Sequence, residues 1–120
     1  MTTVLIADDA LIMRMMLKDL LTKNEFEVIG EAENGEEAVE AFKELNPDLA
    51  LIDILMPVKD GLNAAQEILN FNPDAKIIMI SAMGEREYIA QAQEMGVKSF
   101  ILKPFSPPKV IETLKKVAQN

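Results

Sequence analysis

The sequence predicts a doubly wound α/β fold, in which a five-stranded parallel sheet lies between two layers of helices. Five short apolar runs alternate with longer amphipathic segments along the 120 residues. The runs are apolar on both faces, which is typical of parallel strands covered from both sides. Right-handed crossovers between such strands leave three layers. No linker interrupts the alternation, so we expect one domain over residues 1–120.

The five predicted strands are short and apolar, and polar residues follow or end most of them. They lie at residues 3–7, 27–32, 49–53, 76–81 and 99–102. The third is the clearest, because every residue before its final Asp53 is apolar.

The helices are predicted from apolar residues spaced three or four positions apart. The first covers residues 11–23, and the second begins after Asn34, with Glu37 at capping-box spacing. The third and fourth cover residues 61–71 and 85–95, and the fifth begins at Pro107. The residues expected on their apolar faces are Leu11, Met15, Leu17, Leu20 and Leu21, then Ala38, Ala41, Phe42 and Leu45, then Leu62, Ala65, Ile68 and Leu69, and finally Val110, Ile111, Leu114 and Val117.

The composition limits the chemistry available to the chain. It contains no cysteine and no histidine, which removes thiol nucleophiles, Ser-His-Asp catalysis and most zinc sites. Carboxylates and carbonyls remain as metal ligands, and these favour hard cations such as Mg²⁺. A formal net charge of −8 argues against nucleic-acid binding and points to protein partners. No apolar run approaches the roughly 20 residues that cross a bilayer, and the N-terminus lacks a secretory pattern. We therefore expect a cytoplasmic protein.

Polar side chains stand at the ends of four predicted strands. Asp8 and Asp9 follow the first strand, Asp53 and Ser81 end the third and fourth, and Lys103 follows the fifth. Ligands of a doubly wound sheet bind outside the carboxyl ends of the strands, where these side chains converge. Taken alone, the Asp8-Asp9 pair would more often cap a helix. Asp53 has no such explanation, because a carboxylate ending a buried strand is costly unless it is paired or metal-bound.

Three carboxylates beside one lysine favour a bound cation, and a divalent ion beside a lysine suits a phosphoryl group. In such a site one carboxylate can act as the nucleophile and form an acyl phosphate. The sequence therefore predicts Mg²⁺-dependent phosphoryl chemistry at this edge of the sheet.

The chain resembles response-regulator receiver domains over essentially its whole length. The resemblance rests on Asp8-Asp9, on Asp53 followed by Met56-Pro57 and Gly61, on Ser81-Ala82 and on Lys103-Pro104-Phe105. It implies a flavodoxin-like (βα)5 fold with strand order 2-1-3-4-5. The segments at residues 13–19 and 81–84 are similar to chemotaxis members of the family. The methionines of the first segment are interpreted as core and rim packing rather than a binding groove.

The resemblance also implies roles for the strand-end residues. Asp53 would be the phosphoacceptor, with Asp9, Asp53 and the Leu55 carbonyl as Mg²⁺ ligands and Asp8 acting mainly through water. Lys103 would contact the phosphoryl group, before a cis proline, and Ser81 would move towards it.

An aromatic residue of the last strand turns inward upon phosphorylation in this family. Here that position is Phe100, which has no hydroxyl and could equally be a packed edge aromatic. The partner face implied by analogy lies on the last two helices and the last strand. Its candidate contacts are Gly84, Tyr88, Ile89, Phe100 and Lys109.

The function implied is a monomeric two-component signalling switch and not an enzyme acting on an external substrate. Its phosphate would come from a separate histidine kinase, since the chain has no histidine. The expected output is the flagellar motor switch in chemotaxis or another output protein, and a phosphatase is a further expected partner. The apolar Leu55 and Met83 beside the site predict slow autodephosphorylation.

Four alternatives remain from the sequence. The chain could be a phosphorelay intermediate passing phosphate to a histidine phosphotransfer protein, or a receiver cut from a longer regulator. A phosphatase or phosphomutase is disfavoured because no insertion can form a cap over a substrate. A flavin-binding domain is disfavoured because the acidic loop at residues 8–10 would repel a cofactor phosphate.

Overall fold

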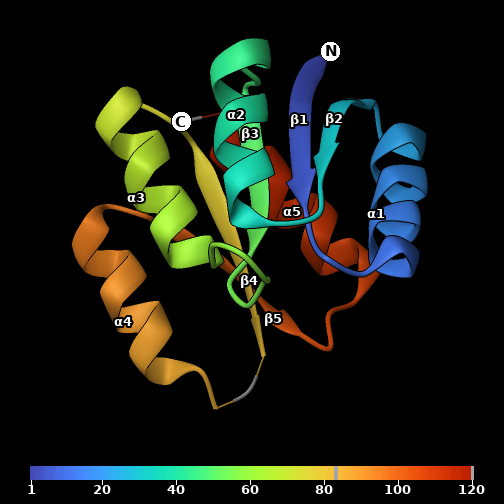
Figure 1. Cartoon of the computed structure of the whole chain (residues 1–120). Helices are drawn as coiled ribbons and strands as arrows, with labels where there is room; N and C mark the ends of the chain where they lie inside the picture. The colour runs from blue at the N-terminus through green and yellow to red at the C-terminus, as the bar shows by residue number, and fades with distance from the viewer. Residues whose placement is uncertain (83, 120) are drawn as a thin grey trace.

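The computed structural model describes residues 1–82 and 84–119, in which strands and helices alternate strictly (Figure 1). The strands are β1 (Thr2–Ala7), β2 (Phe26–Ala32), β3 (Leu49–Asp53), β4 (Ile77–Ala82) and β5 (Ser99–Lys103). The helices are α1 (Leu11–Lys23), α2 (Gly35–Leu45), α3 (Gly61–Phe71), α4 (Arg86–Met95) and α5 (Pro107–Ala118). All four strand pairs are parallel, and the sheet order is β2-β1-β3-β4-β5. The predicted fold class and strand order are confirmed.

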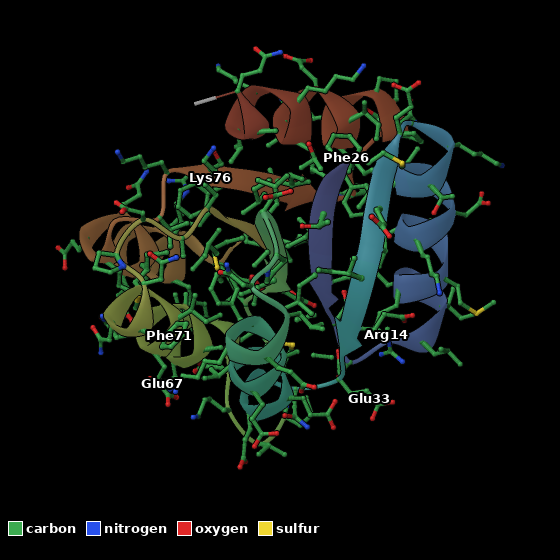
Figure 2. The ribbon with its side chains drawn as sticks, turned by 90° about the horizontal axis from the view of Figure 1, so that it is seen from above. Arg14, Phe26, Glu33, Glu67, Phe71 and Lys76 are labelled. Carbon is green, nitrogen blue, oxygen red and sulfur yellow. The ribbon has the colours of Figure 1, made fainter. Side chains whose placement is uncertain are left out.

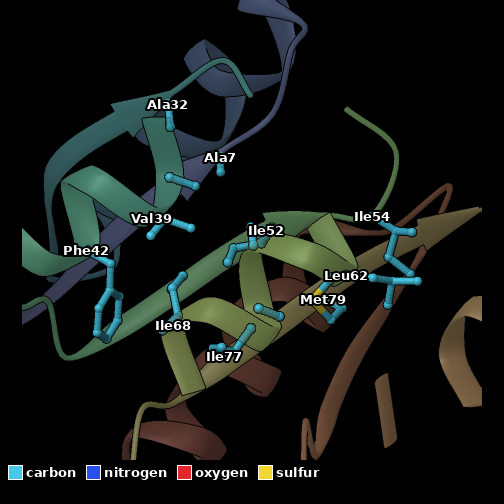
Figure 3. Packing of buried hydrophobic residues seen from close by; sticks show 14 of the residues in the cluster. Ala7, Ala32, Val39, Phe42, Ile52, Ile54, Leu62, Ile68, Ile77 and Met79 are labelled. Carbon is cyan, nitrogen blue, oxygen red and sulfur yellow. The ribbon is translucent and has the colours of Figure 1, made fainter. Parts of the chain in front are cut away.

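Each face of the sheet is buried under its own set of helices. One core cluster joins residues such as Leu5 and Ile52 to α2, α3 and α4, where Phe42 and Ile68 are fully buried (Figure 3). The other joins neighbouring strand residues such as Ile6 to α1 and α5. Successive strand side chains point to opposite faces, so apolar strands of this kind need both helical layers.

The start of α2 contains the predicted capping residue Asn34. The Asn34 side chain accepts a hydrogen bond from the Glu37 amide, as the predicted cap requires. The Glu37 carboxylate returns to the Glu33 amide rather than to that of Asn34. The predicted capping box is therefore displaced by one residue in its second half.

None of the described helices combines the length and apolar character needed to cross a bilayer.

The predicted apolar faces are mostly right, and the errors lie at helix ends and on α1. Leu45 ends α2 with 38% of its surface exposed, because it lies past the edge of the core. Leu11 and Met15 fit the predicted helical spacing, but 59% and 58% of their surfaces are exposed. Apolar residues occur on several sides of α1, and only the side facing the sheet can be buried. Of the methionines there, Met13 packs against the core, whereas Met16 is 56% exposed.

Candidate functional site

The site lies where the strand order reverses, between β1 and β3, at the carboxyl ends of the strands. β1 and β3 are neighbours, and the chain runs from β1 outwards to β2 at one edge and from β3 outwards through β4 to β5 at the other. Asp8 follows β1, Asp53 ends β3, Ser81 lies in β4 and Lys103 ends β5. Parallel strands bring these side chains, distant in the sequence, to a single edge.

The acidic residues form a compact cluster. Carboxylate oxygens of Asp8, Asp9 and Asp53 all lie within 4.8 Å of one another. Asp8 is 1% exposed and Asp53 is 7% exposed, whereas Asp9 faces solvent. The two buried carboxylates and the exposed one thus present oxygen ligands to one point at the surface.

Lys103 supplies the positive charge of the site. Its Nζ lies 3.0 Å from Asp53 Oδ2 and 3.7 Å from Asp8 Oδ2. It donates a hydrogen bond to Asp53, which connects the ends of β3 and β5. Three carboxylates against one ammonium leave a formal charge of about −2, so the site favours a further cation.

The pKa values of Asp53 and Lys103 reflect the free-energy cost of burying charged groups at this site. Burial raises the pKa of Asp53 from 3.8 to about 6, although the hydrogen bond and charge of Lys103 lower it. The charge of Asp8 adds to the increase. Burial lowers the pKa of Lys103, but its hydrogen bond to Asp53 and the nearby carboxylates outweigh burial and raise it. The lysine therefore stays charged, and the Asp53 carboxylate carries an uncompensated desolvation cost.

Two buried polar atoms at this site lack a hydrogen-bond partner among the described residues. They are Asp8 Oδ2 and Ser81 Oγ. Buried polar atoms are rarely left unpaired, so both indicate a ligand that would meet them. The donor set consists of oxygens, which is the set that Mg²⁺ prefers. The residues present therefore fit the predicted metal.

The loops hold these side chains by backbone contacts. Asp8 Oδ1 accepts a hydrogen bond from the Ala10 amide, so it shapes the loop before α1 instead of capping the helix. The Gly61 amide donates to the Ile54 carbonyl at 2.6 Å. A Cβ at Gly61 would lie 2.1 Å from the Asp53 carbonyl, so only glycine allows α3 to start against the end of β3. The Lys103-Pro104 peptide is cis, as the resemblance implied.

The sequence interpretation missed Arg14. This α1 residue is 5% exposed, and its Nη1 donates to the Asp8 carbonyl at 2.6 Å. Its Nε donates to Glu31 at 3.1 Å, and its Nη2 lies 3.5 Å from Glu33, towards which it points in Figure 2. A lone arginine between apolar residues of α1 was the available signal. It ties the loop carrying Asp8 to β2.

The remaining predicted residues lie in the loop after β3 and on or beside α4, β5 and α5. The Leu55 side chain is 52% exposed in the loop after β3. Phe100 on β5 is half-buried and packs against the core cluster beneath α2, α3 and α4. Tyr88 and Ile89 lie on α4, Gly84 precedes it, and Lys109 lies exposed on α5. Met83, expected beside the site, lies outside the described residues.

Comparison with known proteins gives consistent matches. The model of the response regulator receiver domain matches residues 4–115. The chemotaxis protein CheY of Thermotoga maritima is 53% identical over 116 residues, which cover 97% of each chain. CheY of Bacillus subtilis is 51% identical over 113 residues, covering 94% of each chain.

Solved structures agree with the sequence matches. A chain in the crystal structure of the CheX-CheY-BeF3-Mg²⁺ complex from Borrelia burgdorferi superimposes with a TM-score of 0.91. It is 36% identical and the match covers 97% of this chain and 88% of that chain.

Proposed function

The chain belongs to the response regulator receiver family, and from this membership we propose that phosphorylation of Asp53 switches its signalling state. It is a CheY-like receiver of a two-component system. The observation that supports the acceptor assignment is the Asp53 carboxylate, buried at the end of β3 with Lys103 Nζ 3.0 Å away. The other two carboxylates lie beside it, ready to hold a cation.

In the proposed reaction, a carboxylate oxygen of Asp53 attacks the phosphorus of a phosphohistidine on a separate kinase. A P–O bond forms, the P–N bond breaks, and the imidazole leaves with the electron pair. Lys103 stabilises the charge on the phosphoryl oxygens because its Nζ already lies against Asp53. With acetyl phosphate as donor, acetate leaves in place of imidazole. Loss of the group by hydrolysis regenerates the carboxylate and releases phosphate.

Four groups are assigned to a Mg²⁺ ion. Asp9, Asp53 and the Leu55 carbonyl would hold it directly, and Asp8 would act through water. Support comes from the oxygen cluster and from the buried Asp8 Oδ2, which accepts no hydrogen bond from the described residues and lies 3.7 Å from Lys103 Nζ. The bound cation would neutralise charge on the transferring phosphoryl oxygens. The CheY structure from Borrelia burgdorferi contains BeF3 and Mg²⁺, which is consistent with this assignment.

The signal is proposed to leave the site through β4 and β5. The buried Ser81 hydroxyl, which has no partner among the described residues, would turn towards a phosphoryl oxygen. Phe100 lies on the neighbouring strand, where Met79 is its register partner. It would rotate inward and change the face that carries Tyr88, Ile89 and Lys109.

Protein partners follow from the same proposal. The relatives at 53% and 51% identity are chemotaxis proteins, which favours a chemotaxis kinase and output over the phosphorelay alternative. The flagellar motor switch is the proposed output. The crystal complex of CheY with CheX in Borrelia burgdorferi supports the proposal that a further protein binds this chain, and a phosphatase is the proposed class.

The decisive experiment is incubation with acetyl phosphate, with and without Mg²⁺, followed by intact mass measurement. We expect the wild type to gain one phosphoryl group only with Mg²⁺, and Asp53→Asn to gain none because its amide is not a nucleophile.

Asp74→Asn is the matched control, because Asp74 is exposed in the loop between α3 and β4. It should be phosphorylated like the wild type. A wild type that gains no mass while Mg²⁺ binds would contradict the proposed function.

A further inference from the structure

Glu85 makes a contact that neither the fold nor the metal site requires. Its Oε2 accepts a hydrogen bond from the Ala82 amide at 2.9 Å. Glu85 precedes the first residue of α4, yet its side chain makes no capping hydrogen bond to that helix. The carboxylate therefore faces back towards the end of β4 instead of stabilising the helix start.

The Ala82 amide points to the site of phosphorylation. The Ile80 carbonyl accepts from the Ile54 amide at 3.0 Å, so the backbone groups of Ile80 face β3. Backbone groups alternate in direction along a strand, so Ala82, two residues later, faces the same side. β3 ends at Asp53, which is the register partner of Ile80. The Ala82 amide is thus directed into the space beyond Asp53.

A phosphoryl group on Asp53 would extend into that same space. There it would meet Lys103, which pairs with Ala82 in the register of β4 and β5. The Glu85 carboxylate is near enough to this lysine to add to the electrostatic field around it, together with Asp53 and Asp8. An unpaired amide and an ammonium would both bind phosphoryl oxygens well. One of these donors is already occupied by Glu85.

Building on the proposed function, we propose that Glu85 occupies the phosphoryl-binding amide of Ala82 in the unphosphorylated protein and is displaced when Asp53 is phosphorylated. The Glu85 carboxylate and the phosphoryl group would compete for the Ala82 amide, and two negative groups close to the same donor repel each other. The displaced carboxylate is adjacent to the first amides of α4, which attract a negative charge. Its movement would therefore couple phosphorylation to the start of α4, one turn from Tyr88 and Ile89.

The test uses BeF3⁻ with Mg²⁺ as a phosphoryl mimic, on wild type, Glu85→Ala and Glu87→Ala. Glu87 is a matched control because it is exposed in the first turn of α4 and carries the same charge. The Glu85 substitution removes no helix cap, so α4 should persist. Affinity is measured by titration calorimetry, and the Ala82 amide is followed by ¹H-¹⁵N NMR.

We expect Glu85→Ala to bind BeF3⁻ about three- to tenfold more tightly than Glu87→Ala, because no carboxylate must first leave the amide. The Ala82 amide resonance should differ between the free wild type and Glu85→Ala, and should converge when both are saturated. Equal affinities of the two variants, or a wild-type Ala82 resonance unmoved at saturation, would overturn this inference alone. Absence of binding in all three proteins would overturn the proposed function and this inference together.

Discussion

At the scale of single residues, we expect Leu55 to determine what a water molecule meets beside the proposed acyl phosphate. It lies two residues after Asp53, and 52% of its surface is exposed. A leucine side chain has no group that can orient a water molecule for attack on phosphorus. Its exposure also means that a polar substitute would not disturb the core.

We therefore predict that Leu55→Asn loses its phosphoryl group several-fold faster than the wild type, because a carboxamide can orient the attacking water. The measurement is the decay of the phosphorylated mass after excess donor is removed. Val58→Asn is the control, since Val58 lies in the same loop and is 77% exposed. A decay rate for Leu55→Asn equal to that of Val58→Asn would count against this role.

At the scale of elements, α1 is connected to the site through one buried guanidinium. Arg14 reaches the Asp8 carbonyl beyond β1 and the carboxylates of Glu31 and Glu33 at β2. Three elements therefore meet at a single side chain. A buried arginine is tolerated only because its donors are paired, and the pairing fixes the backbone of the loop that carries Asp8.

We predict that Arg14→Ala binds Mg²⁺ about three- to tenfold more weakly than the wild type, because the backbone of Asp8 is no longer held. It should also be less stable by about 1–3 kcal/mol, since the Asp8 carbonyl and Glu31 lose a charged donor. Calorimetric Mg²⁺ titration and urea unfolding measure the two effects.

Lys18→Ala is the comparison for this variant, because Lys18 is exposed and also pairs with Glu31, at 3.6 Å. It should change neither property appreciably. If Arg14→Ala binds Mg²⁺ as tightly as Lys18→Ala does, Arg14 has no positioning role.

Elements with regular apolar spacing could be predicted from the sequence to within about a residue, because periodicity reports burial directly. The apolar character of β3 located both the strand and its terminal Asp53. α1 was less predictable, since apolar residues lie on more sides of it than one sheet face can bury. Leu11 and Met15 fit the helical spacing of α1, yet both lie largely exposed.

At the scale of the whole molecule, the acidic site reduces stability while no cation is bound. The unfolded chain has an ordinary Asp53 with a pKa of 3.8, whereas the folded protein has one of about 6. Between pH 3.8 and about pH 6 the folded state binds more protons than the unfolded state, so the free energy of unfolding falls as the pH rises. Above about pH 6 the cost is fully present, and it corresponds to roughly 3 kcal/mol.

Without Mg²⁺, Asp53→Asn should therefore be more stable than the wild type by about 2–3 kcal/mol at pH 8, and the difference should nearly vanish near pH 4. Urea unfolding across this pH range is the measurement. Saturating Mg²⁺ should stabilise the wild type and narrow the difference, because the cation compensates the buried charge. A difference that does not change between pH 4 and pH 8 would contradict the origin of the effect.

The site as a whole was predictable only in part. The positions of Asp8, Asp53 and Lys103 at strand ends predicted that they lie close together, because the carboxyl ends of parallel strands share one edge of the sheet. The contacts of Arg14 and Glu85 were not predictable, since they depend on how long side chains cross between elements. Such contacts leave no regular pattern in the sequence, whereas a buried strand appears as a run of apolar residues.

The position of Lys103 on β5 links the proposed phosphorylation of Asp53 to the local opening of an edge strand. β5 is an edge strand, joined to the sheet through β4 alone among the described strands. Edge elements open by local unfolding more readily than the centre of a sheet. Whenever β5 separates, Asp53 loses the ammonium that lies 3.0 Å away. For the proposed reaction, in which Lys103 stabilises the phosphoryl oxygens, the fraction of molecules competent for phosphorylation at any instant is then the fraction in which this strand is docked.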